Sequence, residues 1–180
     1  MKKIALILFL FPFLLATQCD EDERPCGRYV EWQIPNLISI ENQQTTYTVG
    51  DVLWLSAIVD RNQNNGNAAI DLFSFDTKLS YYIDLKKSSV YNTFFYLYLN
   101  DNTSVVEQGE AESNTVILTP ENDTFKSKFG IKLLESGTYT LTVYNIASYN
   151  PNQVGCNFTR HSLVTDFSEL ESNTFTFEVQ

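Results

Sequence analysis

The segment SGTYTLTVYN, residues 136–145, decides the fold class of this 180-residue chain. Tyr139, Leu141 and Val143 fall on one side of an extended backbone, and the threonines between them fall on the other. Alternation with a period of two is typical of a strand with one buried face. The segment NTFTFEVQ, residues 173–180, repeats this pattern. We therefore expect two amphipathic strands in the C-terminal third.

The rest of the chain extends this pattern. VGDVLWLSAIV, residues 49–59, opens with a Gly50–Asp51 turn and is apolar on both faces, which predicts a central strand covered on two sides. Residues 163–171, LVTDFSELE, are expected to form one short helical turn. Further strands are expected in YVEWQI (29–34), AIDLFSF (69–75), SYYIDL (80–85), TFFYLYL (93–99), NTVILT (114–119) and FKSKFGIKLL (125–134). Short strands at this spacing predict an all-β protein, an antiparallel β-sandwich.

Two segments resemble the immunoglobulin-like fold. They are YTVGDVLWLSA (47–57), as an early core strand that holds Trp54, and GIKLLESGTYTLTVYN (130–145), as a strand, a corner and a second strand. The resemblance implies that Tyr139, near the start of a penultimate strand, bonds back to the backbone of the corner. Neither segment contains a cysteine, so the intersheet disulfide of antibody domains is absent.

The N-terminus has the composition of a secretory signal. Lys2 and Lys3 precede an apolar run from Ile4 to Ala16 that is short for a permanent transmembrane helix. LLATQC, residues 14–19, then resembles a bacterial lipobox, which implies that Cys19 is acylated and becomes the first mature residue; Gln18 departs from the small residue usual before the cysteine. Several acyl chains hold a protein stably on a membrane, because each buried methylene contributes about 0.8 kcal/mol.

Four acidic residues, Asp20 to Glu23, follow Cys19 directly. They are similar to the export signal that sends lipoproteins to the cell surface in Bacteroidota. The resemblance implies an outer-membrane lipoprotein on the cell surface. The alternative is a solvated, extended tether on a protein that faces the periplasm.

Three cysteines leave an odd thiol in an oxidising compartment. With Cys19 acylated, Cys26 and Cys156 remain as a pair. A disulfide between them would close a loop of about 130 residues and stabilise the fold by about 5 kcal/mol in the chain-entropy model. Two free buried thiols are the alternative.

The sequence predicts three consecutive segments in this chain. The expected signal peptide is 1–18, the lipidated acidic tether 19–27 and a single β-sandwich domain 28–180. The full chain has a net charge of −10, and without Lys2 and Lys3 the 10 basic and 22 acidic residues leave −12. Such a charge argues against nucleic acid as a partner.

The sequence offers little catalytic chemistry. His161 is the only histidine, there is no HExxH or CxxC motif, and we interpret His161 as an exposed residue at a strand end. Loop carboxylates could act on polysaccharide as a pair, which is the competing enzymatic hypothesis. No enzymatic activity and no cofactor are predicted.

One loop resembles an EF-hand. In DRNQNNGNAAID, Asp60, Asn62 and Asn64 alternate and Asp71 is twelfth, but Gly66 falls one residue late. A strand connection that turns at Asn65–Gly66 explains the stretch equally. It is a candidate calcium loop, although no metal is predicted.

The abundant aromatic residues leave two interpretations. Tyr82, Tyr96 and Tyr144 are among those that could form an exposed platform for a glycan or a protein, whereas TFFYLYL (93–99) is expected to supply both faces of a buried sheet. The resulting hypothesis is a lipid-anchored envelope protein, held to the membrane through Cys19, with a noncovalent role in adhesion, glycan binding or protein binding. A structural subunit of an outer-membrane complex is a further alternative.

Overall fold

A computed structural model describes residues 28–64, 68–74, 77–89, 93–149 and 159–180. Within these ranges the chain forms strands and one 3-10 helix, η1 (Leu72–Ser74), but no α-helix. The strands are β1 (Arg28–Gln33), β2 (Ile38–Glu41), β3 (Thr46–Tyr47), β4 (Val52–Asp60), β5 (Asn62–Asn64), β6 (Ala69–Asp71), β7 (Leu79–Ser88), β8 (Phe94–Leu97), β9 (Ser104–Gln108), β10 (Glu110–Glu112), β11 (Thr115–Glu121), β12 (Thr124–Lys132), β13 (Gly137–Val143), β14 (Ile146–Ser148), β15 (Thr159–Val164) and β16 (Thr174–Val179).

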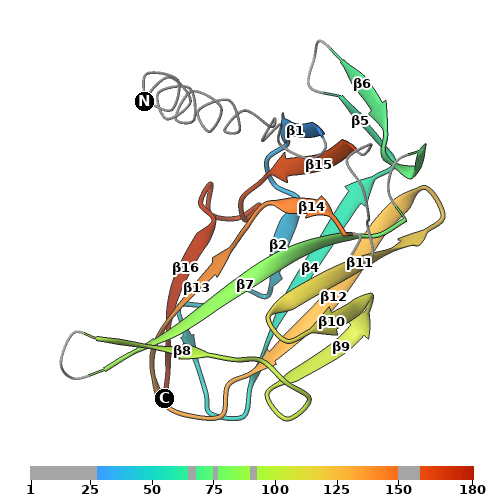
Figure 1. The fold of residues 1–180 in the computed structure, drawn as a ribbon. Helices are drawn as coiled ribbons and strands as arrows, with labels where there is room; N and C mark the ends of the chain where they lie inside the picture. The colour runs from blue at the N-terminus through green and yellow to red at the C-terminus, as the bar shows by residue number, and fades with distance from the viewer. Residues whose placement is uncertain (1–27, 65–67, 75–76, 90–92, 150–158) are drawn as a thin grey trace, which may run out of the picture.

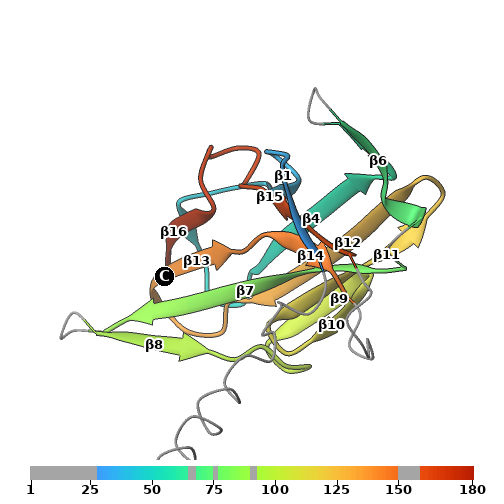
Figure 2. The same cartoon turned by 45° about the horizontal axis from the view of Figure 1, so that its top comes forward.

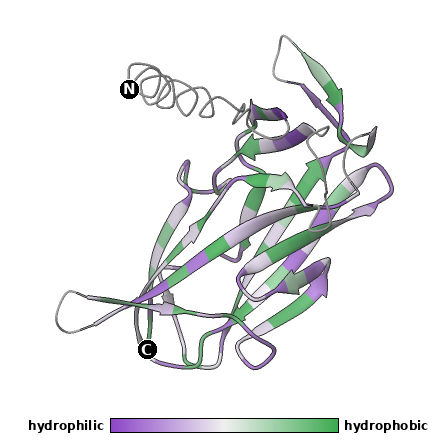
Figure 3. Cartoon of the chain, viewed as in Figure 1, coloured by the Kyte–Doolittle hydropathy of each residue, from purple (hydrophilic) through white to green (hydrophobic). Residues whose placement is uncertain are grey.

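The two alternating segments are strands with one buried face. Tyr139, Leu141 and Val143 on β13 are buried, and the threonines between them are half-buried. β16 pairs antiparallel with β13 and buries its apolar residues on the same side. Figure 3 shows hydrophobic and hydrophilic residues alternating along the strands. The predicted period of two is confirmed because each strand has the core on one side and solvent on the other.

Fourteen of the described strands form two layers of one continuous sheet, and β5 and β6 form a separate two-stranded sheet. One layer contains β2, β4, β12 and β9, and the other contains β8, β7, β13, β16 and β3. β11 joins them, because its first residues pair with β7 and its last residues pair with β12 (Figure 1). The pairs β1–β15 and β3–β16 are parallel, and the other pairs are antiparallel. The predicted all-β, antiparallel sandwich is confirmed.

A single hydrophobic core lies between the layers. The β12 face contributes Phe125 and Phe129, which are fully buried, and β7 contributes Tyr81 and Ile83 from the opposite layer. Burial of a side chain of this size contributes about 1.5–3 kcal/mol, so this core is the main source of stability.

β4 differs from its prediction. It was expected to be covered on both faces, but its burial alternates, and Ile58 is 51% exposed on the outer face. Trp54 also lies on this outer face, half-buried, and is not part of the core. A Cβ placed on Gly130 would lie 2.9 Å from the Trp54 ring, so the ring packs closely against this glycine of the neighbouring strand. The prediction of Trp54 as a core residue is therefore wrong.

Three other predictions need correction. AIDLFSF (69–75) forms only the short strand β6, followed by η1. Residues 163–171 form the end of β15 and a turn closed by the Leu170 N–H to Phe167 O hydrogen bond, not a helical turn. His161 is 3% exposed in the middle of β15, beside the Trp32 ring, so the interpretation of an exposed strand-end histidine is wrong.

Among the residues that the structure describes, no helix has the length and apolar character to cross a membrane.

Candidate binding surface

The strand β8 carries the largest group of exposed aromatic side chains in the described part of the chain. Phe94 is 54% exposed, Phe95 62%, Tyr96 61% and Tyr98, one residue beyond β8, 74%. We call these four residues the β8 aromatic strip. TFFYLYL was expected to lie in a buried sheet, and this prediction is wrong.

The β7–β8 hairpin explains the exposure. The two strands extend together beyond the layers of the sandwich, as both orientations show (Figures 1 and 2). β8 pairs with the last four residues of β7, which are buried at Leu85 but only half-buried at Lys86, Lys87 and Ser88. The hairpin thus leaves the core after Leu85, and its aromatic rings have no opposite layer to cover them.

Lys86 lies beside the Tyr96 ring of the strip. Lys86 Nζ lies 3.0 Å from Asp84 Oδ2 and 5.0 Å from the centroid of the Tyr96 ring. The hydrogen bond to Asp84 raises the pKa of Lys86. A cation at this distance from a ring attracts it, at an exposed site by about 0.5–1 kcal/mol. The lysine therefore favours one orientation of the Tyr96 ring.

A second aromatic pair continues the same outer face. Tyr82 alternates with Asp84 and Lys86 on the outer side of β7. The Tyr144 N–H donates to the Tyr82 backbone oxygen, with an N···O distance of 3.0 Å, so Tyr144 lies beside Tyr82. Tyr82 is 45% exposed and Tyr144 48%, and their ring centroids lie 5.8 Å apart. The face therefore presents tyrosine rings at both ends with the Asp84–Lys86 ion pair between them.

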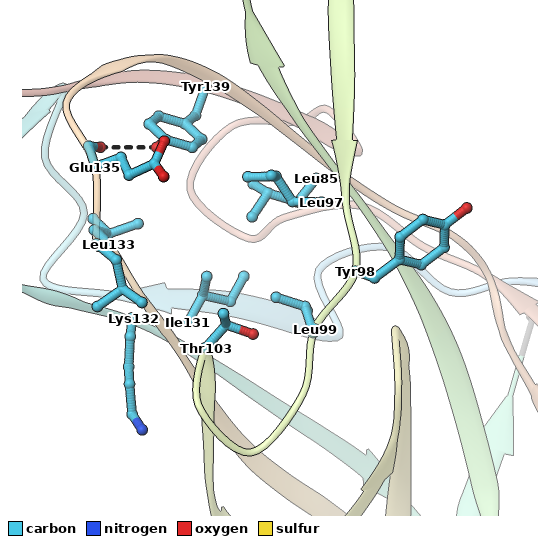
Figure 4. Close-up of a pocket in the computed structure, with 11 residues that line it drawn as sticks. Leu85, Leu97, Tyr98, Leu99, Thr103, Ile131, Lys132, Leu133, Glu135 and Tyr139 are labelled. Carbon is cyan, nitrogen blue, oxygen red and sulfur yellow. Dashed lines mark hydrogen bonds between the residues drawn. The ribbon is translucent and has the colours of Figure 1, made fainter.

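A cavity of about 130 Å³ lies on the inner side of β8. Leu85 and Leu97 line it from one layer, and Ile131 at the end of β12 and Leu133 just after β12 line it from the other (Figure 4). Tyr139 closes one end, and Tyr98 points away from the centre of the group. The cavity wall is therefore mainly aliphatic.

One carboxylate lines this cavity. Glu135 Oε2 lies 2.7 Å from Lys87 Nζ, and this hydrogen bond lowers the pKa of Glu135 and raises that of Lys87. Glycoside hydrolysis needs two carboxyl groups about 5–9.5 Å apart on the two sides of the scissile bond. The cavity lacks the second carboxylate, so its lining does not provide this chemistry.

Asn114 attaches β8 to the body of the sandwich. Its Nδ2 donates to the backbone oxygens of Ile83 and Leu97, at 3.0 and 3.1 Å, and its Oδ1 accepts from the Leu99 N–H at 2.9 Å. The side chain is 4% exposed. β7 pairs with β8 through residues 85–88 and with β11 through residues 79–82. Between these two segments, the Asn114 side chain supplies hydrogen bonds in place of those of a strand ladder. Sequence analysis did not single out Asn114, because its partners are more than ten residues away in the chain.

Tyr139 behaves as the resemblance implied. Its hydroxyl donates to the Glu135 backbone oxygen at 2.8 Å, across the corner that precedes β13. β13 is not the penultimate strand, however, since β14, β15 and β16 follow it.

The candidate calcium loop forms the β5–β6 hairpin. Asn62 pairs with Asp71, and both carboxylate oxygens of Asp71 accept hydrogen bonds from Arg61, at 2.9 and 2.7 Å. The bond to Arg61 lowers the pKa of Asp71. The described residues include no cluster of three His, Cys, Asp or Glu suited to a metal ion. Asn62, Asn64 and Asp71 therefore lie on the paired strands of a hairpin, whereas Asp60 ends β4 and pairs with Thr124.

The predicted sites at Cys19, Cys26 and Cys156 lie outside the described residues. Acylation of Cys19 and a Cys26–Cys156 disulfide remain predictions.

No protein-family model matches this chain, and no curated protein matches it. Among solved structures, the reeler domain of human F-spondin is similar with a TM-score of 0.37 and 11% identity, over 90% of this chain and 100% of that one. A structure of the Reelin-N domain of F-spondin is similar with a TM-score of 0.35 and 11% identity, over 87% of this chain and 94% of that one. Similarity of this degree carries no inference, so the fold rests on the strands and register described above.

Proposed function

We propose that this chain is a lipid-anchored protein of the bacterial cell envelope that binds its partner noncovalently through the β8 aromatic strip. The observation that carries the binding role is the exposure of four neighbouring aromatic side chains, each more than half exposed. Tyrosine and phenylalanine are enriched at binding surfaces, because they bury much area and lose little conformational entropy. A scattered apolar residue needs no such explanation, whereas a contiguous group does.

The lipobox-like LLATQC supports the location. An acylated Cys19 followed by an acidic tether would hold the sandwich close to a membrane and leave the β7–β8 hairpin accessible to other envelope components. This part of the proposal rests on the sequence.

A noncovalent role is favoured over polysaccharide hydrolysis by the composition of the cavity. Glu135 is paired with Lys87, and the remaining lining is largely aliphatic. Asp84 on the outer face is likewise held by Lys86.

A ring-deletion variant tests the binding role. We expect F94S/F95S/Y96S/Y98S to lose retention of envelope components by the immobilised full-length chain, because it removes the exposed rings and leaves the core unchanged. Solubilised envelope proteins and isolated envelope polysaccharide are applied separately, so that the two ligand classes are distinguished.

The matched control is V49T/I58T/V106T, which removes three other exposed apolar side chains, 46%, 51% and 43% exposed. Its binding should equal that of the unmodified chain. Equal binding by the ring-deletion variant would contradict the proposal.

A further inference from the structure

Among the described strands, none pairs with the outer edge of β8. Ser89 N–H donates to Thr93 O at 2.9 Å, and β8 continues in antiparallel register with Phe95 opposite Lys87 and Leu97 opposite Leu85. In an antiparallel pair, hydrogen-bonded residues alternate with residues whose backbone groups point outward. Phe95 and Leu97 therefore face β7 with their N–H and C=O groups, whereas Phe94 and Tyr96 direct theirs away. β7 is the one described strand that pairs with β8.

This edge lacks the protection that other edges of the sheet have. Proteins block exposed edges with charged residues, proline, bulges or very short strands. β2 carries Glu41, β9 carries Glu107 and has a register shift opposite Lys128/Phe129, and β3 has two residues. Residues 88–100 around β8 contain no Asp, Glu, Lys, Arg or Pro. The β8 edge is thus open to pairing where its counterparts are not.

The aliphatic cavity lies on the inner side of this edge strand. Leu97 and Leu99 line it from the chain of β8, and its volume is about 130 Å³. An engineered apolar cavity of about 150 Å³ takes a molecule the size of benzene. A strand added to β8 would direct alternate side chains to the inner side, so one of them lies within reach of this space.

These observations together point to a protein strand as the occupant. A glycan that stacks on Phe94, Tyr96 and Tyr98, which share one face by alternation, would leave Phe95 on the opposite face and the outward backbone groups of β8 uncovered. A lipid medium would leave the outward N–H and C=O groups of β8 without partners, which is costly. A strand satisfies these groups and covers both faces.

We propose that β8 binds an extended segment of a partner protein by strand addition, with one apolar side chain of that segment in the cavity lined by Leu85, Leu97 and Leu133. The net charge of −10 favours a segment with basic residues at its ends. This inference rests on the proposed function, since it names the partner class for the β8 aromatic strip.

The test uses the full-length chain in detergent and a fluorescein-labelled peptide, KTVTLTVTK, measured by fluorescence anisotropy. Saturable binding is expected. Replacing the central Leu of the peptide by Ala should weaken it at least tenfold, because the cavity is then empty. A peptide with N-methyl groups on the backbone nitrogens along both of its edges should not bind, because it can no longer donate the hydrogen bonds that pair it with β8. Binding that survives N-methylation, or no binding of the parent peptide, overturns the inference.

Two variants at one position separate the backbone from the ring. Tyr96→Pro removes an outward N–H, while the bonds to β7 come from its neighbours, so peptide affinity should fall about tenfold with an unchanged thermal unfolding midpoint. Tyr96→Thr also removes the ring but retains the N–H, so its peptide affinity should be about tenfold higher than that of Tyr96→Pro. Equal affinities of the two variants would overturn strand addition.

Other occupants give different results. If the chain forms a concentration-dependent dimer that Tyr96→Pro abolishes, the edge binds a second copy of the chain. If the chain binds phosphatidylcholine–phosphatidylglycerol vesicles and this binding depends on the β8 aromatic strip, the edge binds a membrane. Either result replaces the proposed partner. If the ring-deletion variant loses envelope binding while the peptide does not bind, the proposed function stands and this inference falls.

Discussion

At the scale of single residues, Tyr139 links the sequence resemblance to the structure. Its ring is 4% exposed and stacks on Phe177, with centroids 5.5 Å apart, while its hydroxyl reaches the Glu135 backbone oxygen. One side chain thus packs in the core and closes the corner between the two layers. Burial raises the pKa of Tyr139, so the hydroxyl keeps its proton and remains a donor.

Tyr139→Phe is expected to lower the free energy of unfolding by about 1 kcal/mol, the net value of one hydrogen bond, because the ring remains in place. Denaturant unfolding monitored by fluorescence measures the change. Tyr98→Phe is the control, because that residue is 74% exposed, and it should leave stability unchanged. A loss equal in both variants would show that the corner hydrogen bond does not contribute.

The Glu135–Lys87 pair predicts an acid dependence of stability. Since the native pKa of Glu135 lies below its ordinary value, its contribution is present above the ordinary carboxyl pKa and is lost as the pH falls through the native pKa. Glu135→Gln should be less stable than the unmodified chain near neutral pH, by a small amount because the carboxylate is exposed, and equally stable in acid. Unfolding titrations at several pH values measure this. In a Lys87→Met background the same substitution should have no effect at any pH.

At the scale of elements, β8 depends on few contacts with the body. It pairs with the end of β7 over four residues, Leu97 packs against the core, and Asn114 bonds to the backbone of Leu97 and Leu99. β4, in contrast, pairs with β12 over nine residues. Stability is therefore distributed unevenly, and the candidate binding element lies on a weakly attached hairpin, as is common for binding segments.

Asn114→Ala is expected to cost about 1–3 kcal/mol, because it leaves buried backbone groups of Ile83, Leu97 and Leu99 without partners. Hydrogen exchange should show loss of amide protection in β8 and at Leu99. Amides in β4 and β12 should still exchange only through global unfolding of the variant. Asn102→Ala is the control, because its side chain lies in an exposed turn. Uniform loss of protection across the sheet would contradict the assignment of Asn114 as a local attachment.

At the scale of the whole molecule, one continuous sheet curls around one core. The layers are joined by β11, so the fold has no division into separate units within the described residues. The proposed location in the envelope rests on the N-terminal sequence rather than on the sandwich.

Cys19→Ala is expected to move the chain from the membrane fraction to the soluble fraction, since the proposed acyl chains are then absent. Fractionation with immunoblotting measures this, and mass spectrometry of the N-terminal residue identifies the acyl groups. Cys26→Ala is the matched control and should remain with the membrane. Retention of the Cys19 variant would contradict lipidation.

Much of the fold could be predicted because strand periodicity is local. The alternation in β13 and β16, and the corner at Tyr139, follow from residues adjacent in the chain. The candidate site could not be predicted in the same way. TFFYLYL and LWLSAIV have similar apolar character, but β4 has the core beneath one face, whereas β8 extends beyond the opposite layer.

The sequence by itself determined that this chain is an all-β protein, that β13 and β16 are amphipathic strands and which face of each is apolar, because the direction of successive side chains is set by the backbone. The tertiary structure alone decided which apolar faces are covered. Trp54 and the β8 aromatic strip remain outside the core and His161 lies buried, because burial depends on strands that are distant in the chain.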